Sequence, residues 1–260
     1  MNWMPLVNII SLLVTLVANG LATGLSLGGR TTGQISDAFP VLFTPAGYVF
    51  SIWSVIYIGL IAFAIFQALP SQKSNPRLAR IGPWFTISNL LNTAWIFLWQ
   101  YGYFTLTIFV MLALLFSLAV IFRRLNQGRE RVNGKENWMV NIPFSIYLGW
   151  ISVATIANFS ITLYNLGWTG GGIPQEIWAS GVILVAMLLG LLMALRERQT
   201  AYPLVLIWAF IGIAVKQNLY PPVVMVAIAG ALVLSLTLLL RTIIRIRQPV
   251  GKLAGKPQMR

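Results

Sequence analysis

Eight apolar stretches constrain the fold of this chain more than any other feature. A segment needs about 20 mostly apolar residues to cross a bilayer as a helix. The stretches that reach or approach this length are residues 5–27, 45–69, 81–101, 104–122, 138–164, 175–195, 201–215 and 221–243. Only 9% of the 260 residues are charged, against about 25% in soluble domains. We therefore expect an all-α polytopic membrane protein.

Three of these stretches need a specific interpretation. Residues 1–27 lack a basic start and a small-x-small cleavage site, so we interpret them as a retained first helix rather than a signal peptide. Pro143 lies inside residues 138–164, which predicts a kink or a late helix start. Residues 201–215 are short, which predicts a tilted or half-inserted helix.

The basic residues predict the orientation of the spans. If the N-terminus lies in the cytoplasm, only Arg30 and Lys216 of the 18 lysine and arginine residues face outside. This asymmetry follows the positive-inside rule for eight spans with both termini cytoplasmic, and we expect the bacterial inner membrane. The net charge of +13 is then an orientation signal with some attraction to anionic lipid. Nucleic acid is not an expected partner.

Several kinds of chemistry are disfavoured by what the sequence lacks. It has no histidine and no cysteine, which argues against a metal centre and leaves no disulfide to form. Its five acidic residues fall in loops or at span ends, whereas proton-coupled carriers hold an ionisable group at mid-membrane. No Walker loop and no serine–histidine pair is present. Recognition of an apolar or flat ligand, or a purely structural role, remains.

Aromatic and amide residues recur on single helix faces in three of the spans. In residues 138–164 the pattern is Y-x-x-W-x-x-x-A-x-x-x-N, whose +3, +4, +4 spacing places four side chains on one face. The candidate ligand-binding residues are Trp53, Tyr57, Asn92, Trp95, Tyr147, Trp150, Ala154 and Asn158. If these faces converge, indole planes and two amides line a cavity that suits a flat aromatic ligand.

The same pattern has a second interpretation. Aromatic residues at helical spacing often pack helices together, and asparagines in spans form hydrogen bonds between helices worth about 0.6–2 kcal/mol. Spacing alone does not choose between a ligand cavity and packing.

The motifs resemble those of the TspO/MBR family, which includes the tryptophan-rich sensory proteins and the translocator protein, or peripheral-type benzodiazepine receptor. Three of its motifs occur in order. They are the second-helix proline, tryptophan and tyrosine at Pro45, Trp53 and Tyr57, the third-helix N-x-x-W at Asn92 and Trp95, and the fifth-helix Y-x-x-W-x-x-x-A-T-x-x-N from Tyr147 to Asn158.

The resemblance implies a five-helix bundle over residues 1–166. It also implies a cavity under the first loop that binds porphyrins, sterols or synthetic ligands, and frequent homodimers. Residues 167–246 would add about three transmembrane helices, as a buttress, an oligomer interface or a fused partner. Residues 247–260 would form a basic cytoplasmic tail.

The first loop departs from the family pattern. Gly33–Gln34 replace a Trp-Tyr pair, Phe39 replaces a basic residue and Leu42 replaces a tryptophan. These changes argue against tryptophan-dependent porphyrin breakdown, and they make Phe39 and Phe43 candidates for an apolar lid.

These observations predict a membrane-embedded binding protein for a flat hydrophobic ligand of the tetrapyrrole or sterol type. It would act as a sensor, regulator or carrier. The alternatives are a porphyrin-degrading enzyme, a carrier that moves its substrate across the bilayer, and a structural bundle without a ligand.

Overall fold

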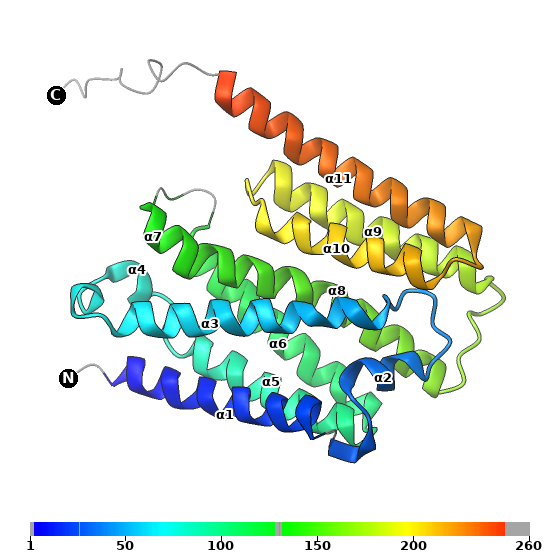
Figure 1. The fold of residues 1–260 in the computed structure, drawn as a ribbon, viewed down its shortest axis with the longest axis horizontal. Helices are drawn as coiled ribbons and strands as arrows, with labels where there is room; N and C mark the ends of the chain where they lie inside the picture. The colour runs from blue at the N-terminus through cyan, green and yellow to red at the C-terminus, as the bar shows by residue number, and fades with distance from the viewer. Residues whose placement is uncertain (1–2, 26, 128–129, 131, 248–260) are drawn as a thin grey trace.

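The computed structural model describes residues 3–25, 27–127, 130 and 132–247, and these residues form helices and turns with no β-strand (Figure 1). The long helices are α1 (Met4–Gly24), α3 (Ile52–Ala68), α5 (Trp84–Gln100), α6 (Phe104–Arg124), α8 (Ile142–Asn165), α9 (Gln175–Leu195), α10 (Ala201–Lys216) and α11 (Pro221–Arg247). Short helices are α2 (Thr32–Asp37), α4 (Pro76–Ala79) and α7 (Gly134–Glu136). The predicted all-α class is confirmed for the described residues.

Each of the eight predicted stretches overlaps one long helix, and several helices extend beyond the predicted bounds. Six helices of the described chain are long and apolar enough to cross a membrane. The other two, α5 with 17 residues and α10 with 16, are shorter than the 22 residues that α3 reaches together with the 3-10 turn before it. At a rise of about 1.5 Å per residue they measure about 25 Å, against a hydrocarbon core of about 30 Å. The chain is therefore a multi-pass membrane protein, and α10 is the shortest of its described long helices.

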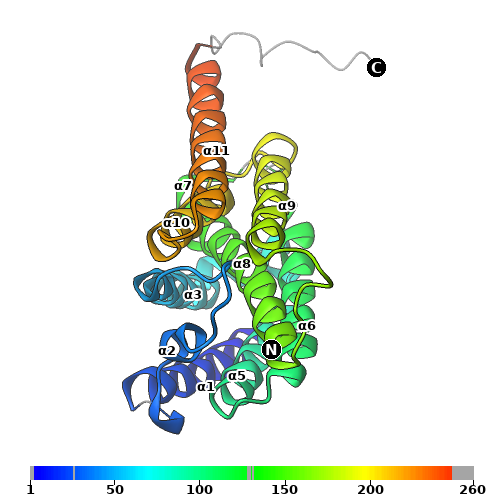
Figure 2. The same ribbon diagram turned by 90° about the vertical axis from the view of Figure 1, so that its right-hand side faces the viewer.

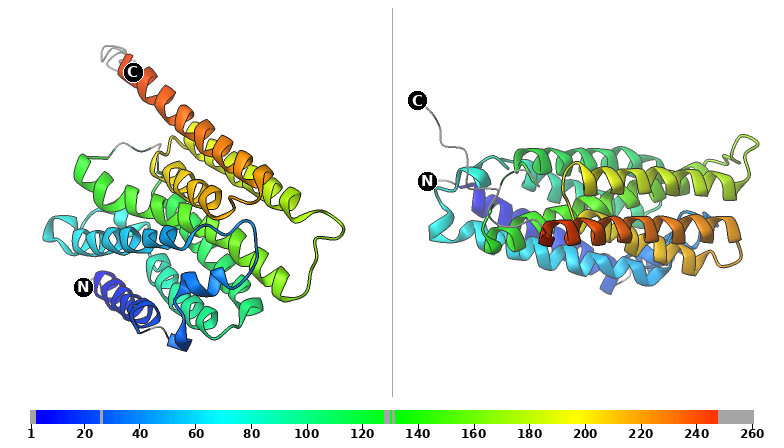
Figure 3. Two further views of the ribbon diagram at one scale, coloured as in Figure 1. Left: turned by 45° about the vertical axis from the view of Figure 1, so that its right-hand side comes forward. Right: turned by 90° about the horizontal axis from the view of Figure 1, so that it is seen from above.

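The long helices pack in three layers, which are clearest along the bundle axis (Figure 2). α1 and α5 form one layer, α3, α8 and α6 form the middle layer, and α9–α11 form the third. The bundle is flattened when seen from above (Figure 3). Helix α8 contacts α3 and α6 of its own layer and α10 of the third layer.

Pro143 is accommodated without breaking the helix that contains it. Residues Asn137–Asn141 form a π-helical turn directly before α8. Such a turn lets the helix continue although Pro143 has no N–H to donate. Gly59 of α3 packs on the Pro143 ring, because a Cβ at Gly59 would lie 2.9 Å from Pro143 Cβ. The proline thus follows a π turn and lies at a close contact between α3 and α8.

A row of buried polar side chains joins α1 to its neighbours. Asn8 donates to Gln67 Oε1 at 2.9 Å and accepts from Thr86 at 2.8 Å. Further along α1, Thr15 donates to the Asn89 carbonyl at 2.9 Å. Hydrogen bonds of this kind replace the weak hydrophobic drive for association inside a bilayer. They fix the rotation of α1 against α5, which carries part of the aromatic cluster.

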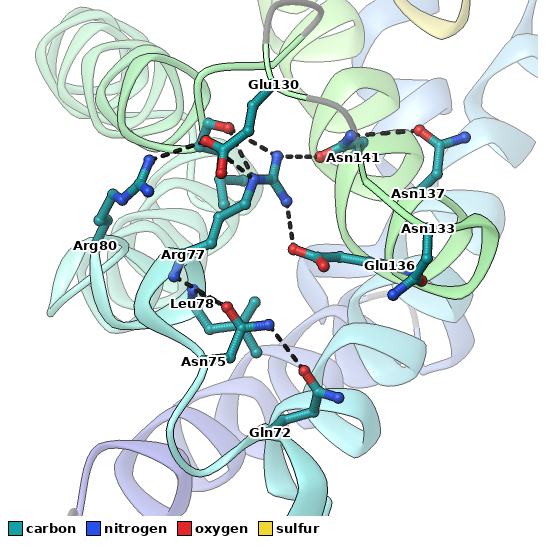
Figure 4. A network of polar contacts seen from close by, with 11 residues as sticks. Gln72, Asn75, Arg77, Leu78, Arg80, Glu130, Asn133, Glu136, Asn137 and Asn141 are labelled. Atoms are coloured by element: carbon teal, nitrogen blue, oxygen red, sulfur yellow. Dashed lines mark hydrogen bonds and ion pairs between the residues drawn. The ribbon is translucent and has the colours of Figure 1, made fainter. Parts of the chain in front are cut away.

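A second polar network lies at the opposite end of the bundle from α2 (Figure 4). The Arg77 guanidinium is 4% exposed and donates to the Leu125 carbonyl at 2.7 and 3.0 Å. It also donates to Glu136 Oε1 at 2.7 Å and to Asn141 Oδ1 at 2.6 Å. The Arg77 side chain therefore provides hydrogen-bond donors for both the Leu125 carbonyl at the end of α6 and the Glu136 carboxylate near α8. The network ties the α4 segment to α6 and α8.

The turn between α8 and α9 contains four glycines in left-handed conformations, Gly167, Gly170, Gly171 and Gly172, with φ between 59° and 90°. Beyond this turn, α10 packs directly on α8, where a Cβ at Gly149 would lie 3.2 Å from the Tyr202 carbonyl. Ser145 of α8 donates to Gln199 Oε1 at 2.6 Å. The C-terminal helices thus contact the middle of the bundle closely.

Candidate functional site

Three tryptophans from three helices meet between the first two layers. The Trp53 ring of α3 lies 6.3 Å from Trp95 of α5 and 6.2 Å from Trp150 of α8, measured between ring centroids. Trp53 also stacks on Tyr57 at 5.5 Å, and Trp95 stacks on Trp99 at 5.4 Å. The helical spacing along each span places these rings on the faces that converge.

A small cavity, here called the aromatic cavity, lies among these rings. Its volume is about 30 Å³, which is room for about two water molecules. It is lined by Ser36, Pro45, Phe50, Trp53, Trp95, Trp99, Trp150, Val153, Ala154, Ala157, Asn158 and Ile161. The cavity is mostly apolar and aromatic, as ligand sites commonly are, but drug-sized ligands occupy about 300–1,000 Å³.

The Trp150 side chain has an unmet hydrogen-bonding group. Its ring is 2% exposed and lines the cavity, and its Nε1 has no hydrogen-bond partner among the described residues. An indole N–H is a donor only, and leaving such a group unpaired in the interior costs about 1–3 kcal/mol. An acceptor atom on a ligand or a water would relieve this cost.

Three of the eight candidate residues lie behind the cavity rather than along it. Asn92 donates to the Tyr147 hydroxyl at 3.0 Å and accepts from Asn19 Nδ2 at 2.8 Å, so it joins α1, α5 and α8. The Tyr57 hydroxyl is close to Asn92 and Tyr147 but does not reach hydrogen-bond geometry. These three side chains support the ring cluster from behind, in the way expected of polar groups between helices.

Asn158 serves both the cavity and the helix packing. Its Oδ1 accepts from Trp95 Nε1 at 3.4 Å, and its Nδ2 donates to Thr107 Oγ1 at 2.7 Å. The amide therefore links α8 to α5 and α6 while it lines the cavity. It holds the Trp95 ring in a fixed orientation.

Five of the eight candidates line the aromatic cavity, namely Trp53, Trp95, Trp150, Ala154 and Asn158. The candidate set omitted residues whose spacing would have indicated them. Trp99 follows Trp95 by four residues, and Phe50 precedes Trp53 by three. Ser36 lies in the short helix α2 and Pro45 in the loop between α2 and α3, outside the long spans whose helical spacing was used.

The cavity is covered on one side by residues 36–50, called here the 36–50 segment. It runs from the end of α2 to the start of α3 and contributes Ser36, Pro45 and Phe50 to the lining. Phe39 packs edge-on against Phe104 at 5.1 Å. The aromatic cavity therefore has a cover, although the predicted lid residues Phe39 and Phe43 are not among those that line it.

Gln34, one of the residues at which the first loop departs from the family pattern, has a structural role at the start of α2. Gln34 forms a capping box with Thr31: the Gln34 N–H donates to Thr31 Oγ1 at 3.3 Å, and the Thr31 N–H donates to Gln34 Oε1 at 2.8 Å. Trp99 Nε1 donates to the Thr32 carbonyl at 3.3 Å, which attaches this short helix to the cluster.

A second cavity of about 50 Å³ is also lined in part by the 36–50 segment. Its walls include Pro40–Phe43, Tyr164 at the end of α8, Trp168 in the glycine-rich turn and Trp178 in α9. The rings of Trp168 and Trp178 meet edge-on at 4.9 Å. The two cavities share the same covering segment and are otherwise lined by different residues.

No group of three or more acidic, histidine or cysteine side chains is placed to hold a metal ion within the described ranges. The polar atoms around the aromatic cavity are amides, indole N–H groups and hydroxyls. The arrangement can stack on a flat ring system and donate hydrogen bonds to it.

Comparison with models of protein families identifies the family of this chain. The family model described as TSPO-like protein matches residues 5–240, which include α9, α10 and most of α11. No curated protein and no solved structure matches the chain. The match covers the aromatic cluster and the helices beyond residue 166 in one alignment. The chain therefore belongs to the TSPO-like family.

Proposed function

We propose that this membrane protein binds a flat hydrophobic ligand, of the tetrapyrrole or sterol type, in the aromatic cavity. The observation that carries the proposal is that Trp150, which lines the cavity, has a buried Nε1 without a hydrogen-bond partner among the described residues. A buried donor without a partner is costly, so a ligand with an acceptor atom gains a hydrogen bond as well as ring contacts. Tetrapyrroles fit better than sterols because they combine flat aromatic rings with several acceptors.

Binding requires the cavity to enlarge. A volume of about 30 Å³ is far below the roughly 300 Å³ that small-molecule sites provide. The tryptophan walls belong to long packed helices, whereas the 36–50 segment consists of loop and short helix. The ligand-free protein is then closed, and the 36–50 segment must open for a ligand to enter or leave.

The proposal is tested by titrating the purified protein with protoporphyrin and following tryptophan fluorescence. Trp150→Phe keeps an aromatic ring but removes the N–H, so its affinity should fall about three- to tenfold, the value of one net hydrogen bond. Trp138→Phe is the matched control, because Trp138 is 70% exposed and far from the cavity lining. Absence of saturable quenching in folded wild-type protein contradicts the proposal.

The proposed orientation places both termini in the cytoplasm of a bacterium, across its inner membrane. The positive-inside rule supports this orientation. Arg77, Arg80 and Arg124 lie at the end of the bundle where α1 begins and α11 ends (Figure 1). The chain has no cysteine, so single cysteines at Lys73 and Leu219 report sidedness directly. A membrane-impermeant thiol reagent should label Leu219→Cys from outside in intact cells, and labelling of Lys73→Cys instead would reverse the orientation.

A further inference from the structure

No residue of helix α10 is among those that line the aromatic cavity. Helix α10 nevertheless forms hydrogen bonds with the 36–50 segment, which covers that cavity. The Ala46 N–H of the 36–50 segment donates to the Gly212 carbonyl of α10 at 3.0 Å. Trp208 Nε1 of α10 donates to the Val49 carbonyl at 3.2 Å. Ala46 and Val49 are the direct chain neighbours of Pro45 and Phe50, which both line the cavity.

Polar side chains at the end of α10 hold the other part of the same segment. Lys216 Nζ forms an ion pair with Asp37 and donates to Thr44 Oγ1 at 2.9 Å. Gln217 Nε2 donates to the Thr44 carbonyl at 3.2 Å. The Lys216 and Asp37 side chains are 22% and 44% exposed, so the charge attraction is screened and the bonds act mainly by fixing position.

The contact between α10 and the segment is closer than any side chain at Gly212 would allow. A Cβ at this position would lie 2.2 Å from Val49 Cγ2 and 3.1 Å from Pro45 Cβ. Val49 is fully buried and its β-branched side chain has little freedom to turn away. An alanine here must push α10 and the 36–50 segment apart.

From these contacts we propose that α10 positions the 36–50 segment over the aromatic cavity and thereby controls ligand entry and release. Trp208, Gly212, Lys216 and Gln217 are then positioning residues that act through the segment and do not touch the ligand. This inference rests on the proposed binding function. It also gives the C-terminal helices a role, because α10 is held in place by α8, α9 and α11.

The test compares Gly212→Ala with Gly181→Ala, a change in the middle of α9 where an added Cβ meets nothing within 4 Å. In ligand-free protein, amide hydrogen exchange of residues 36–50 should accelerate at least about tenfold in Gly212→Ala and stay unchanged in Gly181→Ala. With protoporphyrin, stopped-flow quenching should show that Gly212→Ala raises both the association and the dissociation rate by a similar factor.

Lys216→Met gives a milder second variant that keeps the close packing at Gly212. It should shift the exchange of residues 36–50 and both rates in the same direction. Wild-type exchange and wild-type rates in folded Gly212→Ala and Lys216→Met would overturn the inference. If the wild-type protein binds no protoporphyrin, the proposed function fails, while unchanged exchange of residues 36–50 in the variants separately refutes the positioning by α10.

Discussion

Replacing Arg77 should destabilise the protein far more than replacing its exposed neighbour Arg80. Arg77→Met removes four hydrogen bonds and leaves the Glu136 carboxylate, whose side chain is 11% exposed, without its partner. Breaking a buried ion pair by removing one partner costs about 3–5 kcal/mol. Arg80 is 46% exposed and forms one ion pair with Glu130 at 3.0 Å, so Arg80→Met should cost at most about 1 kcal/mol.

Thermal unfolding in detergent, followed by tryptophan fluorescence, measures this difference. A domain of this size loses about 2–4 °C in Tm per kcal/mol, which predicts a drop of about 6–20 °C for Arg77→Met and at most about 4 °C for Arg80→Met. Arg77→Met combined with Glu136→Gln should recover part of the loss, because no unpaired charge remains. Equal Tm values for Arg77→Met and Arg80→Met would refute the buried network.

Two further changes test the packing that supports the aromatic cavity. Gly59→Ala should cost about 1–3 kcal/mol in the free energy of unfolding, because its Cβ would lie 2.9 Å from the rigid Pro143 ring; Gly20→Ala, with open space around it, is the control, and equal stability of the two variants would contradict this contact. Asn92→Leu removes the amide that joins α1 to α8 and should cost about 1–2 kcal/mol; unchanged stability by the same assay would show that these hydrogen bonds are not formed.

The sequence predicted the long helices well because each apolar run has one low-energy solution in a bilayer. A backbone in hydrocarbon must satisfy its own hydrogen bonds, so every run of sufficient length becomes a helix. The prediction for Pro143 was a kink or a late start, and the structure shows a π turn just before it. Periodicity does not reveal such a turn, since it changes the hydrogen-bonding pattern without changing the apolar character.

The lining of the aromatic cavity matches the candidate residues only in part, for a geometric reason. Helical spacing identifies which side chains share a face, and it correctly grouped Trp150 with Ala154 and Asn158 beside one cavity. It does not give the crossing angle or depth of neighbouring helices, which decide that Tyr147 turns toward Asn92. The aromatic cavity and the packing interpretation therefore both describe parts of the same cluster.

The partners of Arg77 and Lys216 could not be predicted from the distribution of charges along the chain. Arg77 and Lys216 were assigned to opposite sides of the membrane from their loops alone. The structure buries Arg77 in a network formed with residues 48 to 64 positions away. It pairs Lys216 with Asp37 across 179 positions. Contacts at such separations depend on the packing of whole helices, which a single sequence does not encode locally.

The most direct test of the binding account is photo-crosslinking with a porphyrin that carries a diazirine, followed by mass spectrometry of the labelled peptides. The account predicts labels on Val153, Ala154 and Ala157 of α8, with loss of labelling when unmodified protoporphyrin competes. Labels confined to Trp168 and Trp178, in the second cavity, or labels that protoporphyrin does not displace, would contradict the claim that the tryptophan cluster around Trp150 is the ligand site.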